Sequence, residues 1–234
     1  MELNLESAFL GLTLVTVLFL IYIGFNAIKL SSESPKKDTF ILVFCLVGWQ
    51  WFIYGLSSTG LLVSYDFPPL FALAFIVPSF LFTGVFLFRS RNKQWPKFIP
   101  EQWVIYFQSF RILVELLFVF ALVEGVFNAE VTIEGYNYDL VFAASAPIVG
   151  ILVYALKVLP RRILVYWNYL GLGVLASVIV LFLCSIYQPE LFGSPEPLLP
   201  LISMTYPYVL IAGFLMPVAV FLHILSLVQL NRKL

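Results

Sequence analysis

The stretch Gln108-Ser109-Phe110-Arg111-Ile112-Leu113-Val114-Glu115 decides the fold, because it places a cation and an anion inside an apolar run. That run, Gln102–Glu124, has the length of a helix that crosses a bilayer, about 20 residues. On insertion scales, a charge at the centre of such a helix costs about 2.5–3.5 kcal/mol. Gln108, Arg111 and Glu115 are spaced by three and four residues and share one helix face. We therefore expect this face to point into a bundle of helices.

The composition of the whole chain also indicates a membrane protein. Of 234 residues, 62% are hydrophobic and 11% are charged, whereas soluble domains hold about 25% charged residues. Cys45 and Cys184 lie in apolar runs, which favours packing over a disulfide framework. A single histidine, His223, argues against a multi-histidine zinc or haem site. We expect no cofactor, no metal and no catalytic residue set.

Seven apolar runs predict an all-α, polytopic membrane protein with seven transmembrane helices in one domain. Each run is about 20 residues long, as a spanning helix requires. The first run follows Glu2 and Glu6 rather than basic residues, so we expect a retained span and not a cleaved signal. The predicted spans are Ala8–Lys29, Thr39–Leu62, Phe67–Phe88, Gln102–Glu124, Tyr138–Lys157, Arg162–Tyr187 and Thr205–Leu230.

The charges of the connections alternate along the chain. Of the 13 basic residues, all except Arg111 lie near span ends or in the connections that follow the first, third, fifth and seventh spans. The N-terminus and the other connections hold acidic residues and no Lys or Arg. Because Lys and Arg accumulate in cytoplasmic loops, this pattern predicts an outside N-terminus and a cytoplasmic C-terminus.

Other polar residues in the predicted spans could meet the charges of the fourth span. At about 1.5 Å per residue, His223 and Asn168 lie at similar depths, and Gln50 lies near the middle of its span. One interpretation is a polar pocket in the cytoplasmic half that binds an anionic group and relays protons. The other is a structural staple in which Arg111 and Glu115 neutralise each other. The candidate ligand-binding residues are Arg111, Glu115, Gln108, His223, Asn168 and Gln50.

The connection before the fifth span is rich in oxygen ligands, namely Glu130, Glu134, Asn137 and Asp139. Carboxylate and amide oxygens are ligands for Ca²⁺, although the spacing matches no EF-hand. The alternative is that Asn137 or Asp139 caps the fifth span while the other residues form a solvated loop.

Proline spacing hints at an internal repeat. Phe67-Pro68 is followed by Pro78, and Tyr206-Pro207 is followed by Pro217 at the same spacing. This pattern predicts two parallel repeats, residues 8–88 and 138–230, around the span 102–124. The resulting 3+1+3 layout resembles SWEET-type sugar transporters in architecture alone, because their Pro-Gln loop signature is missing.

Three segments resemble a bacterial family of seven-span proteins without a known activity. They are Thr132-Ile-Glu-Gly-Tyr-Asn-Tyr-Asp139, Trp167-Asn168 and Pro217-Val-Ala-Val-Phe-Leu-His223-Ile-Leu-Ser-Leu. The resemblance covers the last three spans best. It implies a compact, multi-pass protein of the cell (inner) membrane and transfers no catalytic residue.

Several functions are excluded or ranked by what the spans contain. The last span has no lysine for a retinal Schiff base, and zincin, serine-hydrolase and P-loop motifs are absent. The first hypothesis is binding or transport of a small polar or anionic solute. The alternatives are a seven-span sensor or partner-binding subunit, and an intramembrane lipid-modifying enzyme that uses Glu115 or His223. Expected partners are the lipid bilayer, a small solute and further copies or a membrane partner protein; nucleic acid is not expected.

Overall fold

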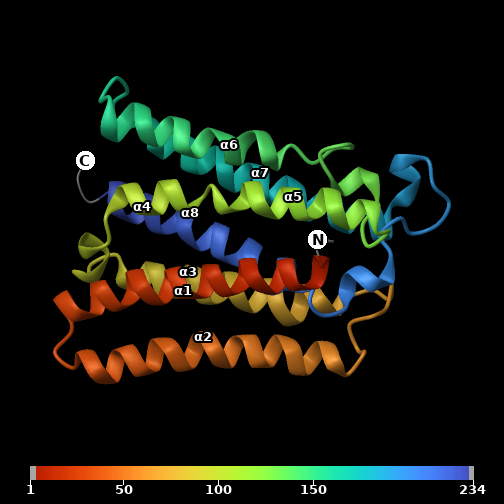
Figure 1. The fold of residues 1–234 in the computed structure, drawn as a ribbon, viewed down its shortest axis with the longest axis horizontal. Coiled ribbons are helices and arrows are strands. Elements are labelled where there is room, and N and C mark those ends of the chain that lie inside the picture. Colours follow the sequence, from red (N-terminus) through yellow and green to blue (C-terminus); the bar gives the residue numbers. More distant parts are fainter. Residues whose placement is uncertain (1–3, 232–234) are drawn as a thin grey trace.

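A computed structural model describes residues 4–231 and shows an all-helical protein. Within that range the chain forms helices and connections and no strand, so the all-α prediction is confirmed. The long helices run back and forth along one axis (Figure 1). They are α1 (Leu5–Ser31), α2 (Pro35–Ser58), η1 with α3 (Ala72–Ile76, Val77–Ser90), α4 and α5 (Glu101–Phe107, Phe110–Val123), α6 with η4 (Asp139–Gly150, Ile151–Ala155), α7 (Ile163–Tyr187) and η7 with α8 (Ile211–Leu215, Met216–Leu230).

Six helical segments of the described chain are long and apolar enough to cross a membrane, which makes this a multi-pass membrane protein. The exception is Asp139–Ala155, in which α6 contributes 12 residues and η4 contributes 5. Short 3₁₀ turns lie in the connections: η2 (Trp95–Phe98), η3 (Ala129–Val131), η5 (Pro189–Phe192) and η6 (Leu201–Met204).

Successive helices alternate in direction, which sorts the connections between two ends of the bundle (Figure 1). The connections after α1, α3 and η4 lie at the end where α8 finishes. These connections and the helix ends next to them carry the described Lys and Arg residues other than Arg111, so we call it the basic end. The connections after α2, α5 and α7 lie with the start of α1 at the opposite end, which we call the acidic end.

Two predicted spans begin later than expected, because prolines interrupt their starts. The run predicted from Phe67 becomes helical at Ala72, and the run predicted from Thr205 at Ile211. In both, a five-residue π-helical segment leads into an α-helix whose second residue is proline. Proline donates no backbone hydrogen bond and its ring needs room near the carbonyl four residues earlier, which a wider turn provides. The peptide bonds before Pro68 and Pro207 are cis.

The fourth predicted span is interrupted between α4 and α5. The amides of Gln108 and Ser109 bond to carbonyls three residues earlier, at 3.1 Å each. The Arg111 amide does the same with the Gln108 carbonyl, at 3.2 Å. This tight turn separates α4 from α5 while Gln108, Arg111 and Glu115 all stay buried.

Helix α8 lies in the centre of the bundle and α2 at its edge. Helix α8 packs against α3, α4 and α7, and most of its residues are buried. Helix α2 packs on α1 and buries only Ile53 and Ser57 (Figure 1). The aromatic side chains of Phe40, Phe44 and Trp51 on α2 are exposed, as a lipid-facing helix requires.

The connection from 124 to 138 folds back into the bundle. Arg111 near the start of α5 bonds to Asp139, the first residue of α6. At about 1.5 Å per residue, α6 therefore begins roughly 18 Å from the far end of α5, and Figure 1 shows this offset. Irregular backbone is tolerated at membrane depth where protein covers it. Buried residues of this connection are Val126, Phe127, Val131, Thr132 and Asn137.

One glycine permits the tight fold of this connection. A Cβ on Gly135 would lie 2.5 Å from the Ala129 carbonyl oxygen and 2.6 Å from the Glu130 Cα. Just beyond it, the amide of Tyr136 bonds to the Glu130 carbonyl at 3.1 Å. Only a residue without a side chain fits this approach of two backbone segments.

Candidate functional site

Arg111 is buried, with 2% of its surface exposed, and its ion-pair partner is Asp139. The Arg111 Nε donates to Asp139 Oδ2 at 2.9 Å, and Nη2 donates to Oδ1 of the same carboxylate. Such a two-point contact matches the planar guanidinium to the carboxylate. The predicted staple is therefore wrong in its partner, since Arg111 forms its ion pair with Asp139 on α6 and not with Glu115.

His223 is held in one neutral form by its two neighbours. Arg111 Nη1 lies 3.0 Å from His223 Nε2, and a guanidinium only donates, so Nε2 must accept. The proton then resides on Nδ1, which donates to Asn168 Oδ1 at 2.9 Å. Both ring nitrogens are engaged and the residue is fully buried. In this arrangement His223 links α5, α7 and α8 through Arg111 and Asn168.

Asn168 extends the contacts from His223 to Ser226, one turn further along the same face of α8. Its Nδ2 donates to the Leu164 carbonyl at 2.7 Å and to Ser226 Oγ at 2.9 Å. The amide orientation is fixed, because only the oxygen can accept from His223 Nδ1. Asn168 therefore ties α7 to α8 through two different residues of α8.

Aromatic rings enclose the histidine and the guanidinium. The ring of Trp167 lies 5.3 Å from that of His223, and Phe142 lies 4.9 Å from Trp167. The Arg111 Cζ sits over the Phe142 ring, 5.3 Å from its centroid. Gly171 makes room for this cluster, since a Cβ there would come 2.5 Å from His223 Nε2. The rings surround two side chains that are almost wholly buried.

Glu115 joins these contacts through Asn137, which also bonds to Asp139. Asn137 Nδ2 lies 3.1 Å from each oxygen of the Glu115 carboxyl group, and Asn137 Oδ1 accepts from the Asp139 amide at 3.0 Å. Among residues 4–231, Asn137 is the single hydrogen-bond donor to Glu115. The resulting polar network joins α5, α6, α7 and α8 and consists of Glu115, Asn137, Asp139, Arg111, His223, Asn168 and Ser226.

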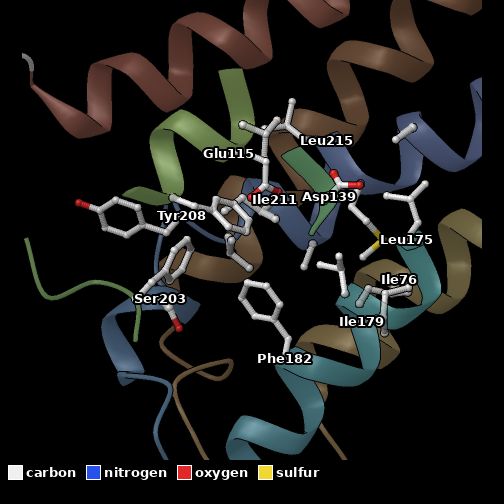
Figure 2. A pocket seen from close by; sticks show the side chains of 18 of the residues that line it. Ile76, Glu115, Asp139, Leu175, Ile179, Phe182, Ser203, Tyr208, Ile211 and Leu215 are labelled. Carbon is white, nitrogen blue, oxygen red and sulfur yellow. The ribbon is translucent and has the colours of Figure 1, made fainter. Parts of the chain in front are cut away.

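An almost wholly apolar pocket of about 80 Å³ lies next to this network, between α5, α7, η1 and η7. Its polar end is formed by Arg111, Glu115 and Asp139. Figure 2 shows the Glu115 and Asp139 carboxyl groups on one side of the pocket, with Phe182 and Ile179 of α7 across from them. We call this space the apolar pocket.

The six candidate ligand-binding residues do not gather around one cavity. Only Arg111 and Glu115 line the apolar pocket, while His223 and Asn168 are sealed within the polar network. Gln108 donates to the Ala219 carbonyl at 3.2 Å. Gln50 lies on the peripheral helix α2, and its Nε2 has no hydrogen-bond partner within the described chain. The sequence pointed to a polar pocket nearer the basic end, but the pocket is apolar and reaches Leu199 and Met204 toward the acidic end.

From the sequence, Asn137 and Asp139 were expected either as Ca²⁺ ligands or as a cap of the fifth span, and their contacts with Glu115 and Arg111 were not expected. Both are buried, with 1% and 4% of their surfaces exposed. The signal that could have revealed this is the short apolar helix that begins at Asp139, since a helix too short to cross the membrane can begin inside the bundle.

Residues 4–231 contain no group of three or more His, Cys, Asp or Glu able to hold a metal ion.

Comparison with known proteins adds no relative. No protein-family model, no curated protein and no solved structure matches this chain. The resemblance to a bacterial seven-span family and to the SWEET layout stays a prediction. The function must therefore be argued from the geometry of the site.

Proposed function

We propose that this membrane protein binds a small amphiphile with an apolar body and a cationic or hydrogen-bond-donating head. The apolar body would occupy the apolar pocket, and the head would bond to the Glu115 carboxyl group. One observation carries the proposal. Glu115 is buried at the polar end of this pocket with a single donor nitrogen among residues 4–231, from Asn137, whereas the carboxyl group has room for about four hydrogen bonds.

The charges around the pocket favour a cation over the anionic solute expected from the sequence. Arg111 and Asp139 neutralise each other through a two-point contact. Glu115 then adds a further carboxyl group to the same end of the pocket. An anionic head would have to displace Asp139 from Arg111 and would approach two carboxyl groups in a region of low dielectric constant.

The size of the pocket limits the apolar body of the ligand to a short segment. Its 80 Å³ is about half of the 150 Å³ cavity that holds benzene in a well-studied case. A narrow alkyl segment fits this space, and each buried methylene contributes about 0.8 kcal/mol. The α7 residues Val178, Ile179 and Phe182 are only half-buried, so this wall is the natural entrance from the bilayer.

Three ligands of equal chain length test the proposed head-group preference. Octylamine, octanol and octanoate would be titrated onto the protein in lipid nanodiscs and compared at equal membrane-bound concentration. We expect octylamine to bind most tightly of the three. Glu115→Gln should weaken octylamine binding by about tenfold, which is the effect of losing one charge-assisted hydrogen bond, and should leave octanol binding nearly unchanged. Glu124→Gln is the matched control, because Glu124 is exposed at the end of the same helix.

The opposite ranking would contradict the proposal. If octanoate binds tightest and Arg111→Gln abolishes its binding, the site recognises anions, as the sequence alone suggested. If none of the three ligands binds more tightly to the protein than to empty nanodiscs, the apolar pocket is not a binding site for amphiphiles.

We also propose the membrane topology, in which Asp139–Ala155 and the buried connection before it make a seventh crossing. The alternation of basic and acidic ends supports an outside acidic end and a cytoplasmic basic end. Cysteines at Ser194 and Asn92, in a background without Cys45 and Cys184, test this. A membrane-impermeant maleimide should label position 194 in intact cells and position 92 only after lysis. Labelling of both in intact cells would refute it.

Transport of the bound amphiphile is the natural extension, and the repeat hypothesis supports it. The π segments η1 and η7 have equal lengths, precede equivalent prolines and pack against each other. Trp49 of the first half donates to the Gly213 carbonyl of the second half at 2.9 Å. In transporters built from parallel repeats, the substrate site lies at the repeat interface. Uptake of octyltrimethylammonium into proteoliposomes, abolished by Glu115→Gln, would support transport; unchanged uptake would exclude Glu115 from it.

A further inference from the structure

A second and larger cavity opens at the basic end of the bundle. It has a volume of about 680 Å³ and lies between the start of α4, the connection 91–100, the end of η4 and the end of α8. Ligand sites in proteins typically occupy about 300–1,000 Å³. We call this space the basic cavity. It is separate from the apolar pocket and shares no lining residue with it.

The charges of the basic cavity favour an anion. Lys97, Lys157 and Arg161 line it together with one carboxylate, Glu101. Arg161 and Glu101 form an ion pair, which leaves the two lysines as an excess of positive charge. Both lysines are exposed, so their ammonium groups can reorient toward a ligand. A phosphate group is the anion that several lysine and arginine side chains hold best.

Two residues that line the cavity each carry a polar atom with no partner among residues 4–231, which indicates more than a bare phosphate. Gln229 is buried, with 4% of its surface exposed, and its Nε2 donates to the carbonyls of Pro96 and Ile99 at 2.8 Å each. These two acceptors fix the amide orientation, and Oε1 has no partner within the described chain. The Tyr154 hydroxyl is likewise buried without a partner in residues 4–231.

A buried amide oxygen without a donor is unfavourable, and a phosphate dianion has no hydrogen to offer it. A ligand hydroxyl group supplies this donor. The Tyr154 hydroxyl can then donate to a phosphate oxygen or bond to a second ligand hydroxyl. The lining therefore combines lysines, which suit a phosphate group, with Gln229 and Tyr154, which suit a ligand hydroxyl group.

We propose that the basic cavity binds a phosphorylated polyol of the glycerol phosphate class. The same chemistry occurs in the head group of an anionic glycerophospholipid and in a free polyol phosphate. Lys97 and Lys157 hold the phosphate, Gln229 accepts from a hydroxyl group, and Tyr154 bonds between them. This site goes beyond the amphiphile binding proposed at Glu115 and does not depend on it.

Soluble probes test the chemistry directly. Glycerol 3-phosphate, inorganic phosphate and glycerol would be titrated onto the full chain in phosphatidylcholine nanodiscs by calorimetry. We expect glycerol 3-phosphate to bind about tenfold more tightly than phosphate, and glycerol alone not to bind. Lys97→Gln and Lys157→Gln should each weaken glycerol 3-phosphate about tenfold, with Arg162→Gln as the control outside the cavity.

Tyr154→Phe separates the hydroxyl side from the phosphate side without disturbing the fold, because the hydroxyl has no protein partner within residues 4–231. It should reduce the preference for glycerol 3-phosphate over phosphate several-fold and leave phosphate binding unchanged. If phosphate binds as tightly as glycerol 3-phosphate, or if Tyr154→Phe has no effect on the preference, the polyol assignment is overturned.

Nanodiscs of different lipid composition test the membrane source. Phosphatidylglycerol should raise the melting temperature above that in phosphatidylcholine and phosphatidylserine, and the Lys97→Gln/Lys157→Gln variant should lose this difference. A response to phosphatidylglycerol alone identifies a lipid head group, and a response to glycerol 3-phosphate alone identifies a soluble ligand. An equal effect of phosphatidylserine, or no response to either probe, overturns the proposal. Octylamine binding by the same variants reports on the Glu115 site separately.

Discussion

Replacing Asp139 by Asn tests the ion pair at the centre of the polar network. The substitution keeps the shape of the side chain and one acceptor oxygen but removes the charge opposite Arg111. Arg111 then keeps His223 Nε2 as a neutral acceptor, while its own charge stays buried. We expect a large loss of stability, because among residues 4–231 the guanidinium has no second carboxylate within direct hydrogen-bond contact.

The magnitude follows from the burial of both partners. Their side chains are 3% and 6% exposed, so the pair is fully desolvated. Breaking such a pair by removing one charge costs about 3–5 kcal/mol. Hydrogen bonds between membrane helices average about 0.6 kcal/mol, so a neutral contact would give a much smaller effect. The comparison pair, Arg161–Glu101, has an arginine side chain that is 42% exposed, and Arg161→Gln should cost about 1 kcal/mol or less.

A double-mutant cycle in mixed micelles, with unfolding followed in a denaturing detergent titration, measures the pair itself. The variants are Arg111→Gln, Asp139→Asn and their combination. We expect a coupling energy of about 2–3 kcal/mol, since the double variant buries no unpaired charge. The Arg111→Gln/Glu115→Gln cycle should give a smaller coupling. A larger coupling with Glu115 than with Asp139 would refute the assignment of partners.

Three further substitutions test other parts of the account. Gly171→Ala should destabilise the protein by about 1–3 kcal/mol, because the added Cβ would clash with His223. Gly173 has open space around it, so Gly173→Ala should be neutral or stabilising in the same unfolding titration. Trp49→Phe removes the bond to the Gly213 carbonyl and should cost about 1 kcal/mol, while Trp51→Phe, at an exposed site, should cost nearly nothing; equal effects would contradict a bridging role for Trp49. Ile179→Trp should fill the apolar pocket and abolish octylamine binding, whereas Val180→Trp, exposed on the next position of α7, should bind octylamine normally; retained binding in both would show that the ligand lies elsewhere.

Most of the helices could be predicted from the sequence, because an apolar run of spanning length with few charges is typical of a transmembrane helix. The fourth predicted span, Gln102–Glu124, agrees with the helical stretch Glu101–Val123 to one residue at each end. The runs after Phe67 and Thr205 were predicted too long, because the prolines near their starts exclude helical backbone bonds. Apolar composition does not reveal where a chain of apolar residues stops being helical.

The contacts of Arg111 were predictable in part. Counting residues along helices correctly placed His223 and Asn168 at similar depths, and the two side chains bond to each other. The same counting failed for Asp139, because it assumes that every helix begins at the membrane surface. The buried connection 124–138 carries Asp139 inward, and that path depends on tertiary contacts such as those of Asn137. Counting depth also failed to place Gln50, because the order of the spans does not reveal that α2 lies at the edge of the bundle, away from Arg111.

The apolar pocket could not be predicted, because its walls come from segments far apart in the chain. Residues of α5, α7, η1 and η7 line it, and apart from Arg111 and Glu115 these are ordinary apolar residues in the sequence. Only the carboxyl groups at its end mark it as a site, and one of them, Glu115, was selected for its burial in an apolar run. The charge sign of the expected ligand changed because the structure pairs Arg111 with Asp139.

The most direct test of the central claim is a structure of the protein in complex with octylamine. We expect the ligand nitrogen within about 3 Å of the Glu115 carboxyl group, its alkyl chain along Ile179 and Phe182, and the Arg111–Asp139 pair intact. A ligand head group at Arg111 with Asp139 displaced, or an alkyl chain outside the apolar pocket, would contradict it.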